Sequence, residues 1–277
     1  MAPFRFFVYS NLFIAVCAVL MVMQSYQLLL HARPDREVMG FVFFSTICSY
    51  SFHWYLSSDS APGAPRSSWQ QRYHYVHIIL FFVGAIGAAV LGLLLLKHWF
   101  WLLLSAVPTF LYTAPKIPNK YFKALRKVAL GKTIFLAMVW MFVTTVLPVG
   151  ISGAKWSGDF YLFFVSRFFL IYAICILFDW RDREDDKAHG IRSLITYLDE
   201  KRILYLFIFS LFIFALSTLL LYRYDYKISD IIILLIPGII TAVSYKYAKK
   251  KFSDMFYYFF LDGLMAFSAL IMFISRI

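Results

Sequence analysis

Residues 160–190 read FYLFFVSRFFLIYAICILFDWRDREDDKAHG, and they join an apolar run of membrane-spanning length to a strongly acidic segment. Five acidic side chains fall within the eight residues from Asp179 to Asp186. If the segment stays helical, Asp179, Asp182 and Asp186 stand at i, i+3 and i+7 and project from one face. Oxygen ligands of this kind suit Mg²⁺, which takes one or two carboxylates together with substrate phosphates. An acidic helix end or a solvated charged loop is the alternative.

The composition of the chain is that of a membrane protein. Its 277 residues are 62% hydrophobic and 15% charged, and the mean hydropathy is +0.72. A soluble domain carries about 25% charged residues, so the sequence predicts a multi-pass membrane protein. We expect residues 1–277 to form a single all-α membrane domain, because about nine spans of ~20 residues leave little room for a separate soluble domain.

Apolar runs mark the expected membrane spans along the chain. They are Val8–Leu30, Val38–Ser57, Tyr73–Leu96, Trp99–Ala114, Thr133–Gly150, Phe160–Phe178, Ile203–Tyr222, Ile228–Tyr247 and Met255–Ile274. The first run is longer than the apolar part of a secretory signal peptide, and no small-residue cleavage site follows it. In the third run Gly84, Ala88 and Gly92 recur at every fourth residue, a spacing that favours close helix packing.

Lysine and arginine lie mostly on one side of these spans. Nineteen of the 27 basic residues share the side of the acidic segment, seven lie on the other side, and Arg167 lies within a span. The positive-inside rule therefore predicts that the N-terminus and the acidic segment are cytoplasmic and that the C-terminus is on the opposite side. The same bias explains the net charge of +12 by attraction to anionic membrane lipids, so we expect no nucleic-acid partner.

A basic loop between the fourth and fifth spans lies on the same predicted side as the acidic segment. It contains the candidate phosphate ligands Lys120, Lys123, Arg126 and Lys132. A diphosphate needs positive charge around its oxygens and Mg²⁺ between it and any carboxylates, so the two segments form a chemically coherent site. For each lysine of the loop, the alternative to phosphate binding is the ordinary anchoring of membrane spans by basic residues. The charge of Arg167 is energetically unfavourable inside a membrane span unless the side chain faces a water-filled cavity or a partner.

The order of these features resembles the UbiA superfamily of intramembrane prenyltransferases over nearly the whole chain. The second aspartate-rich motif of that family is D-x-x-D-x-x-x-D, followed by Gly and a Thr/Ser-Leu pair. Here the three spaced aspartates of the acidic segment precede Gly190, Ser193 and Leu194. Tyr112 and the basic loop after it are similar to the family's region after the fourth helix, where basic residues bind diphosphate. The resemblance implies nine transmembrane helices around a central cavity.

The family's first aspartate-rich motif, N-D-x-x-D-x-x-x-D after the second helix, is degraded in this chain. Its positions fall on Ser51, Phe52, Tyr55 and Asp59, so the last carboxylate alone is present. Ser51 and Asp59 remain candidate substrate contacts. For the nearby His53 we expect packing or hydrogen bonding.

The resemblance implies Mg²⁺-dependent transfer of a prenyl group from a prenyl diphosphate to an apolar acceptor in the membrane. Asp179, Asp182 and Asp186 would bind the metal and act in catalysis. The expected substrate-binding residues are Lys120, Lys123, Arg126, Lys132, Arg167, Tyr112, Ser51 and Asp59. The alternative is a non-catalytic relative that binds an isoprenoid lipid or a membrane partner through the remaining half of the site.

Overall fold

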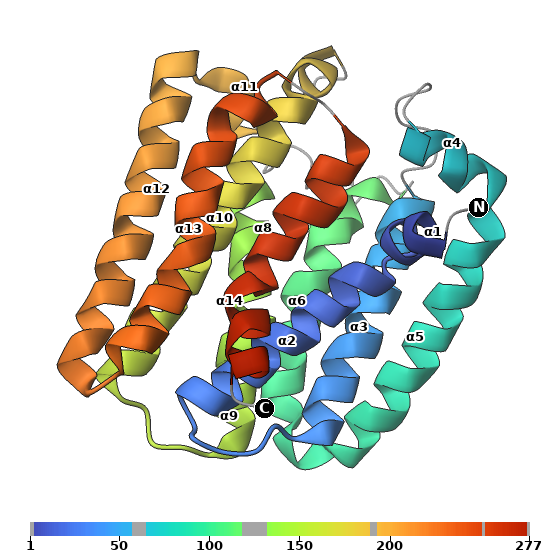
Figure 1. The fold of residues 1–277 in the computed structure, drawn as a ribbon. Helices are drawn as coiled ribbons and strands as arrows, with labels where there is room; N and C mark the ends of the chain where they lie inside the picture. Colours follow the sequence, from blue (N-terminus) through green and yellow to red (C-terminus); the bar gives the residue numbers. More distant parts are fainter. Residues whose placement is uncertain (1–2, 57–64, 118–131, 189–192, 251–252, 276–277) are drawn as a thin grey trace.

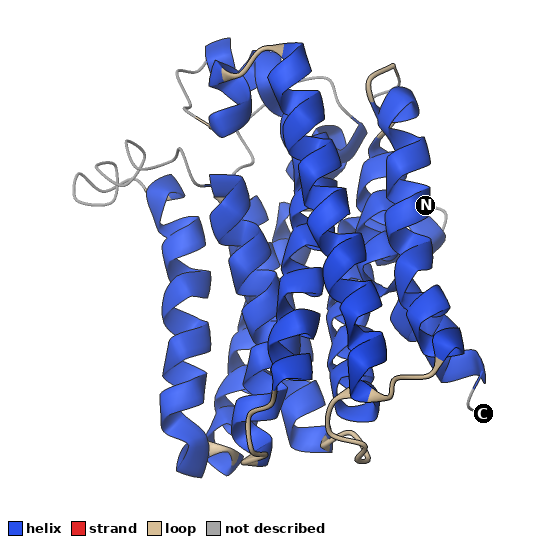
Figure 2. Cartoon of the chain, turned by 90° about the vertical axis from the view of Figure 1, so that its left-hand side faces the viewer, coloured by secondary structure: helices blue, strands red, loops and turns tan. Residues whose placement is uncertain are grey.

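The computed structural model describes residues 3–56, 65–117, 132–188, 193–250 and 253–275, and within these ranges the regular structure is entirely helical (Figure 2). The longer helices are α2 (Leu12–Leu28), α3 (Arg36–Tyr55), α5 (His74–Leu94), α6 (Trp99–Thr113), α10 (Gly158–Ala188), α12 (Glu200–Leu220), α13 (Ile228–Ala248) and α14 (Asp262–Ser275). The shorter ones are α1 (Pro3–Tyr9), α4 (Pro65–Arg72), α8 (Lys132–Met141), α9 (Leu147–Ser152) and α11 (Leu194–Tyr197). A π-helical turn at Phe142–Val146 joins α8 to α9, and another at Phe256–Leu261 leads into α14.

The long helices form a bundle in which successive helices run in alternating directions (Figure 1). Helix α3 packs along α5, α10 packs along α12 and α8, and α2 packs along α3 and α14. Helices α4 and α11 lie at one end of the bundle, and α1 lies towards that end, whereas the C-terminus lies near the other end (Figure 1). Which end faces the cytoplasm remains a prediction from the basic residues.

Every expected span coincides with a helical segment, although the count of nine crossings is not confirmed. By length and composition six helical segments of the described chain can cross a membrane: His74–Leu94, Thr133–Ser152, Gly158–Glu184, Glu200–Tyr224, Ile228–Ala248 and Phe256–Ser275. Helices α1 and α2, which meet at a bend of 66°, make a seventh if they count as one span. Helix α6 has 15 residues, fewer than the ~20 of a bilayer crossing, and α3 also falls outside the six.

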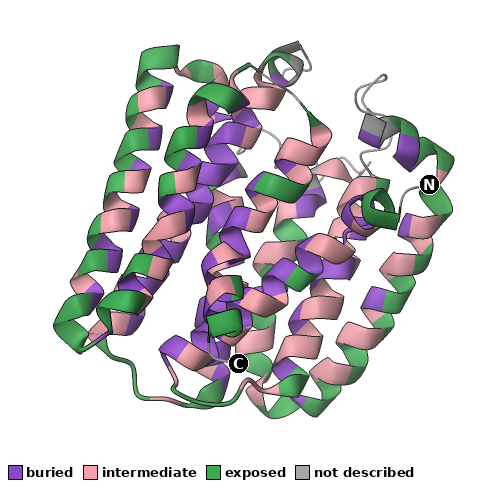
Figure 3. Cartoon of the chain, viewed as in Figure 1, coloured by how far each residue is buried: buried purple, intermediate pink, exposed green. Residues whose placement is uncertain are grey.

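Helix α10 lies at the centre of the bundle and α5 at its periphery. Of the most apolar window of α10, 72% is buried inside the protein, against 11% for α5 (Figure 3). The outward face of α5 carries Ile79, Phe82, Ile86 and Val90, all more than half exposed. Apolar side chains on the outside of a bundle are expected where lipid is the solvent. The acidic segment thus belongs to the most buried of the candidate spans.

Helices α3 and α5 approach each other closely at Gly84. A Cβ atom at this position would lie 2.6 Å from the backbone nitrogen of Cys48 and 2.8 Å from the carbonyl oxygen of Phe44. Both atoms belong to the backbone and cannot swing aside. At Gly92 a Cβ would lie 3.5 Å from the ring of Phe41, an ordinary contact. The packing expected from the small residues therefore depends on Gly84.

We predict that Gly84→Ala destabilises the protein by about 1–3 kcal/mol, the usual range for overpacking a well-packed interface. The matched substitution Gly92→Ala should have a much smaller effect, because the added methyl group meets a flexible ring. Thermal unfolding of both variants in detergent measures the difference. Equal melting temperatures for the two variants and the unaltered protein would contradict the close approach of α3 and α5.

Candidate active site

The acidic segment forms the last turns of α10. The helix continues to Ala188, so Asp179, Asp182 and Asp186 remain on one helical face, as the spacing predicts. Asp179 and Asp186 are buried, each with 7% of its surface exposed. An ionised carboxylate is unfavourable in a low-dielectric interior unless polar or charged partners compensate. The end of α10 is therefore a place where cations and hydrogen-bond donors are required.

Helix α8 supplies one of these donors. Thr133 Oγ1 donates a hydrogen bond to Asp179 Oδ2. Helix α8 begins at Lys132, so this hydrogen bond fixes the end of the predicted basic loop beside the acidic segment. The Lys132 side chain lies outside the described residues, as do the other expected phosphate ligands of the loop, Lys120, Lys123 and Arg126.

Asp182 is held by its neighbour in the sequence. Arg181 Nε lies 2.6 Å from Asp182 Oδ1, and Arg181 Nη2 lies 3.2 Å from Asp182 Oδ2. The two-point contact turns one edge of the carboxylate towards the guanidinium group. The Asp182 side chain is 40% exposed, so its remaining lone pairs are accessible.

The described residues do not gather three metal-binding side chains into one cluster of His, Cys, Asp or Glu. The three aspartates share a helical face without converging, because i, i+3 and i+7 positions spread over two turns. Their oxygen atoms are still the ligand type that Mg²⁺ prefers, and that ion completes its shell with water and phosphate oxygens. Among the described residues, the donor set thus fits Mg²⁺ whose shell is completed by water and phosphate oxygen atoms.

Two arginines next to the acidic segment share one aromatic ring. Arg181 Nη2 donates a hydrogen bond to the Tyr258 hydroxyl group at 2.9 Å, and its guanidinium carbon lies 4.8 Å from the ring centroid. The guanidinium carbon of Arg66 lies 3.9 Å from the same centroid and 4.0 Å from the centroid of the Trp54 ring. Arg66 is 4% exposed, and burial lowers the pKa of its guanidinium below the ordinary value.

Asn11 fixes the position of Arg66. It lies at the bend between α1 and α2 with a φ angle of 69°, a left-handed conformation that asparagine tolerates better than most residues. Its Oδ1 accepts a hydrogen bond from Arg66 Nη2 at 3.0 Å, and its Nδ2 lies 3.5 Å from Ser51 Oγ. Asp254 accepts a hydrogen bond from the Arg66 backbone N–H group at 2.7 Å. Ser51, predicted from the first motif, is thereby connected to the acidic end of α10 through Asn11, Arg66, Tyr258 and Arg181.

The start of the basic loop lies beside the end of α3. The ring of the predicted residue Tyr112 stacks on His53 with the centroids 5.3 Å apart. Lys116 Nζ lies 2.8 Å from His53 Nε2. An ammonium group donates and cannot accept, so His53 accepts at Nε2. His53 thus has the packing and hydrogen-bonding contacts that the sequence predicts for it. Asp59 lies outside the described residues.

Arg167 lies deeper in the bundle than the other predicted residues. It precedes Asp179 by 12 positions on the same helix, which places it roughly 18 Å away along the axis. The side chain is 1% exposed and donates a hydrogen bond to Ser268 Oγ at 3.2 Å. Its guanidinium group also lies over the rings of Phe163 and Phe214. The described structure therefore separates Arg167 from the acidic segment and surrounds it with hydroxyl groups and rings.

The residues that connect the two halves of the site could not be predicted from the sequence. Arg66 is one of the many basic residues on the side of the acidic segment, and Arg181 stands between two of the spaced aspartates. Asn11 and Tyr258 stand within apolar runs at opposite ends of the chain. An asparagine that interrupts an apolar run was the one local signal, because a buried amide requires hydrogen-bond partners.

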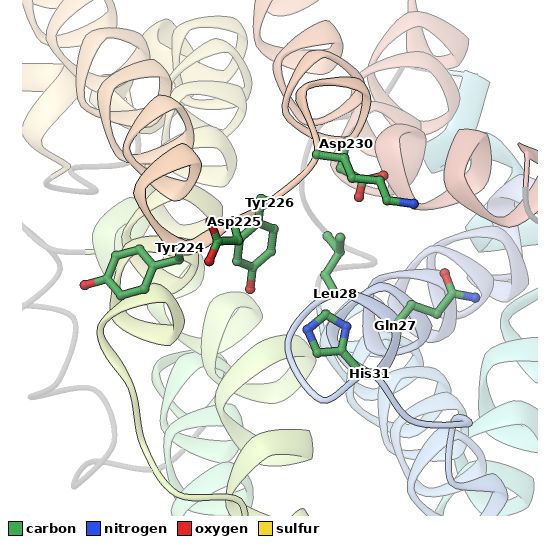
Figure 4. Close-up of a pocket in the computed structure, with 8 residues that line it drawn as sticks. Gln27, Leu28, His31, Tyr224, Asp225, Tyr226 and Asp230 are labelled. Carbon is green, nitrogen blue, oxygen red and sulfur yellow. The ribbon is translucent and has the colours of Figure 1, made fainter.

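One cavity lies away from these residues. It has a volume of about 380 Å³ and lies between the end of α2 and the α12–α13 turn (Figure 4). Figure 1 shows this turn at the end of the bundle opposite to the end of α10. Its lining residues are Gln27, Leu28, His31, Tyr224, Asp225, Tyr226, Lys227 and Asp230. None of the predicted site residues belongs to it. This cavity is therefore separate from the predicted site.

The sequence was also compared with known proteins. No curated protein and no solved structure matches the chain. The model of the UbiA prenyltransferase family matches residues 70–270, which include the whole of α10 with its acidic end. This match covers more than half of the 277 residues. The chain is therefore a multi-pass membrane protein that belongs to the UbiA prenyltransferase family.

Proposed function

We propose that this chain transfers a prenyl group from a prenyl diphosphate to an apolar acceptor within the membrane, with Mg²⁺ bound at the acidic end of α10. The observation that carries the proposal is the burial of Asp179 and Asp186, each 7% exposed, at the end of the central helix of a UbiA family protein. Buried carboxylates at a membrane helix end are unfavourable without a cation. The basic residues on the same end support its placement in the cytoplasm.

Asp179, Asp182 and Asp186 are the residues that would hold the metal. Mg²⁺ bound there would neutralise negative charge on the departing diphosphate. The protein's own contribution to binding the diphosphate is positive charge, which we assign to Lys120, Lys123, Arg126 and Lys132. Ser51, Tyr112 and Asp59 are proposed as further contacts at the end of α3 and α6. Arg167 is proposed as a substrate contact deeper in the bundle.

In the proposed reaction the bond between the prenyl carbon and the diphosphate oxygen breaks, and its electron pair leaves with the diphosphate. The allylic carbon then forms a bond with an electron pair of the acceptor, which loses a proton. Aromatic faces stabilise a positive charge and exclude water. The rings of Trp54, Phe178 and Tyr258 stand next to one another at this end of the bundle, with Trp54 and Tyr258 at 5.7 Å and Phe178 and Tyr258 at 6.0 Å.

A second function is favoured by a specific observation. Asp182 is engaged by Arg181, and the first-motif positions Ser51, Phe52 and Tyr55 carry no carboxylate. A protein that keeps the aspartates of α10 but lacks most of the first motif could bind an isoprenoid lipid or a membrane partner without cleaving a diphosphate. The two functions differ in whether the purified protein releases diphosphate.

The first prediction from this proposal is that Mg²⁺ and diphosphate bind together. Carboxylates that do not converge hold Mg²⁺ weakly, so phosphate oxygens must supply the missing ligands. We expect Mg²⁺ to strengthen the binding of a non-hydrolysable prenyl diphosphate analogue by roughly tenfold or more in calorimetry. Asp182→Asn should remove this coupling. Glu184→Gln is the matched control, because Glu184 is 79% exposed on the same helix and pairs with Lys187. Equal coupling in both variants would exclude the metal site.

The second prediction concerns the basic loop. If it binds diphosphate, Lys123→Glu or Arg126→Glu should weaken binding of the analogue by roughly tenfold or more. Lys201→Glu makes the same change in net charge at an exposed position of α12 and should have little effect. Lys249 is unsuitable as a control, because it pairs with Glu200 and lies 4.6 Å from the Trp180 ring centroid. Similar losses in all three variants would indicate a general electrostatic role.

The third prediction concerns turnover. Asp179→Asn, Asp182→Asn and Asp186→Asn preserve shape and remove charge, so each should lower the rate of prenyl transfer at least roughly tenfold, or about 1.4 kcal/mol of barrier. His53→Ala should have a smaller effect, and Asp225→Asn, at the opposite end of the bundle, should have none. Loss of turnover in His53→Ala together with full activity of the three α10 variants would show that the site is misplaced.

A further inference from the structure

A second cavity lies where the end of α3 meets α4 and the start of α5. Its volume is about 160 Å³, and Trp54, Tyr55, Gln70, His74 and His77 line it. Trp54 connects it to the acidic end of α10, because the Trp54 ring also contacts Arg66 and Tyr258, whereas Gln70, His74 and His77 lie on α4 and α5. Such a volume is several times the roughly 30 Å³ that one water molecule occupies in the liquid. The cavity therefore has room for a small polar group such as a phosphate.

Two buried nitrogen atoms of the cavity lining have no hydrogen-bond partner among the described residues. They are Nε2 of Gln70 and Nε2 of His77, whose residues are 4% and 2% exposed. Buried polar atoms are almost always hydrogen-bonded in folded proteins. Because both residues line the same cavity, a ligand in it is the partner that both atoms can reach.

The hydrogen bonds around Asn11 determine that His77 is a donor towards this cavity. Arg66 Nη2 donates to Asn11 Oδ1, which leaves the Asn11 amide nitrogen facing His77 Nδ1 at 3.5 Å. Since an amide nitrogen donates, His77 accepts at Nδ1 and carries a proton on Nε2. The amide nitrogen of Gln70 is a donor as well. The cavity thus presents two N–H groups that require acceptor oxygens.

The electrostatic environment of the cavity favours an anion. Among the described residues, those that line it include no Asp or Glu. His74 and His77 stand in the first turn of α5, a helix of 21 residues. The N-terminal end of a helix carries a partial positive charge that favours anionic oxygens. The two N–H donors and the helix N-terminus both point to an oxyanion.

The position of the cavity on α5 indicates where this oxyanion comes from. Helix α5 is the least buried of the candidate spans, and its outward face is apolar. The acyl chains of a lipid lying along Ile79, Phe82, Ile86 and Val90 would place the phosphate at the start of the helix, where the cavity lies. We propose that this cavity binds the phosphate group of a membrane phospholipid. The proposal is independent of the prenyl transfer reaction.

Calorimetry on the full-length protein in detergent tests this proposal with three probes. They are a short-chain phospholipid, the diacylglycerol with the same chains, and inorganic phosphate. We expect the phospholipid to bind roughly tenfold or more tightly than either other probe, the effect of a hydrogen bond to a charged group. Equal binding of the phospholipid and the diacylglycerol would overturn the phosphate site. Equal binding of inorganic phosphate would overturn the lipid as its source.

Substitutions at Gln70 provide the second part of the test. Gln70→Met removes the donor at similar volume, and Gln70→Glu keeps the shape and adds a charge that repels phosphate. Both should weaken phospholipid binding by roughly tenfold, and either one suffices if the other does not fold. Arg72→Gln is the matched control, because Arg72 is on the same helix, is exposed and does not line the cavity. A loss in Arg72→Gln as large as in the Gln70 variants would indicate general attraction of anionic lipid and would falsify the site.

Discussion

The end of the bundle that carries the acidic segment depends on the burial of one cation, the guanidinium group of Arg66. A charge with 4% exposure must be compensated locally, and here the compensation comes from the rings of Trp54 and Tyr258 and the amide of Asn11. These partners belong to the end of α3, the π-helical turn before α14 and the bend between α1 and α2. The requirement to satisfy a single buried cation therefore holds together segments from both ends of the chain.

The same cluster determines what α10 can do. Tyr258 contacts Arg66 on one side and accepts a hydrogen bond from Arg181, which in turn engages Asp182. Asp182 is thus held by a fixed positive charge, whereas Asp179 is bonded to the start of α8. A carboxylate whose oxygen atoms already accept hydrogen bonds from the protein has a low affinity for a metal ion by itself. This limit is the physical reason for proposing that metal and diphosphate bind as one unit.

The sequence was sufficient to predict α10 and its acidic face, because apolar length and aspartate spacing are local properties. It also predicted that Ser51 and Tyr112 lie at the same end, through the resemblance to the UbiA family. It could not predict the contact of Arg66 with Asn11, which are 55 positions apart, or with Tyr258. Such contacts depend on how the helices pack. In the sequence, an arginine in a polar segment cannot be distinguished from the basic residues that commonly flank membrane spans. The count of nine crossings is not confirmed, because the described helices α3 and α6 fall outside the segments that can cross a membrane by length and composition.

The central claim is that Mg²⁺ and a prenyl diphosphate bind together at the acidic end of α10. The most direct test is an experimental structure of the protein with Mg²⁺ and a non-hydrolysable prenyl diphosphate analogue. We expect a metal ion between the diphosphate and at least one of Asp179, Asp182 and Asp186, with the prenyl chain directed into the bundle. A diphosphate bound at the opposite end, in the cavity beside His31 and Tyr226, or bound without metal and out of reach of α10, would contradict this claim.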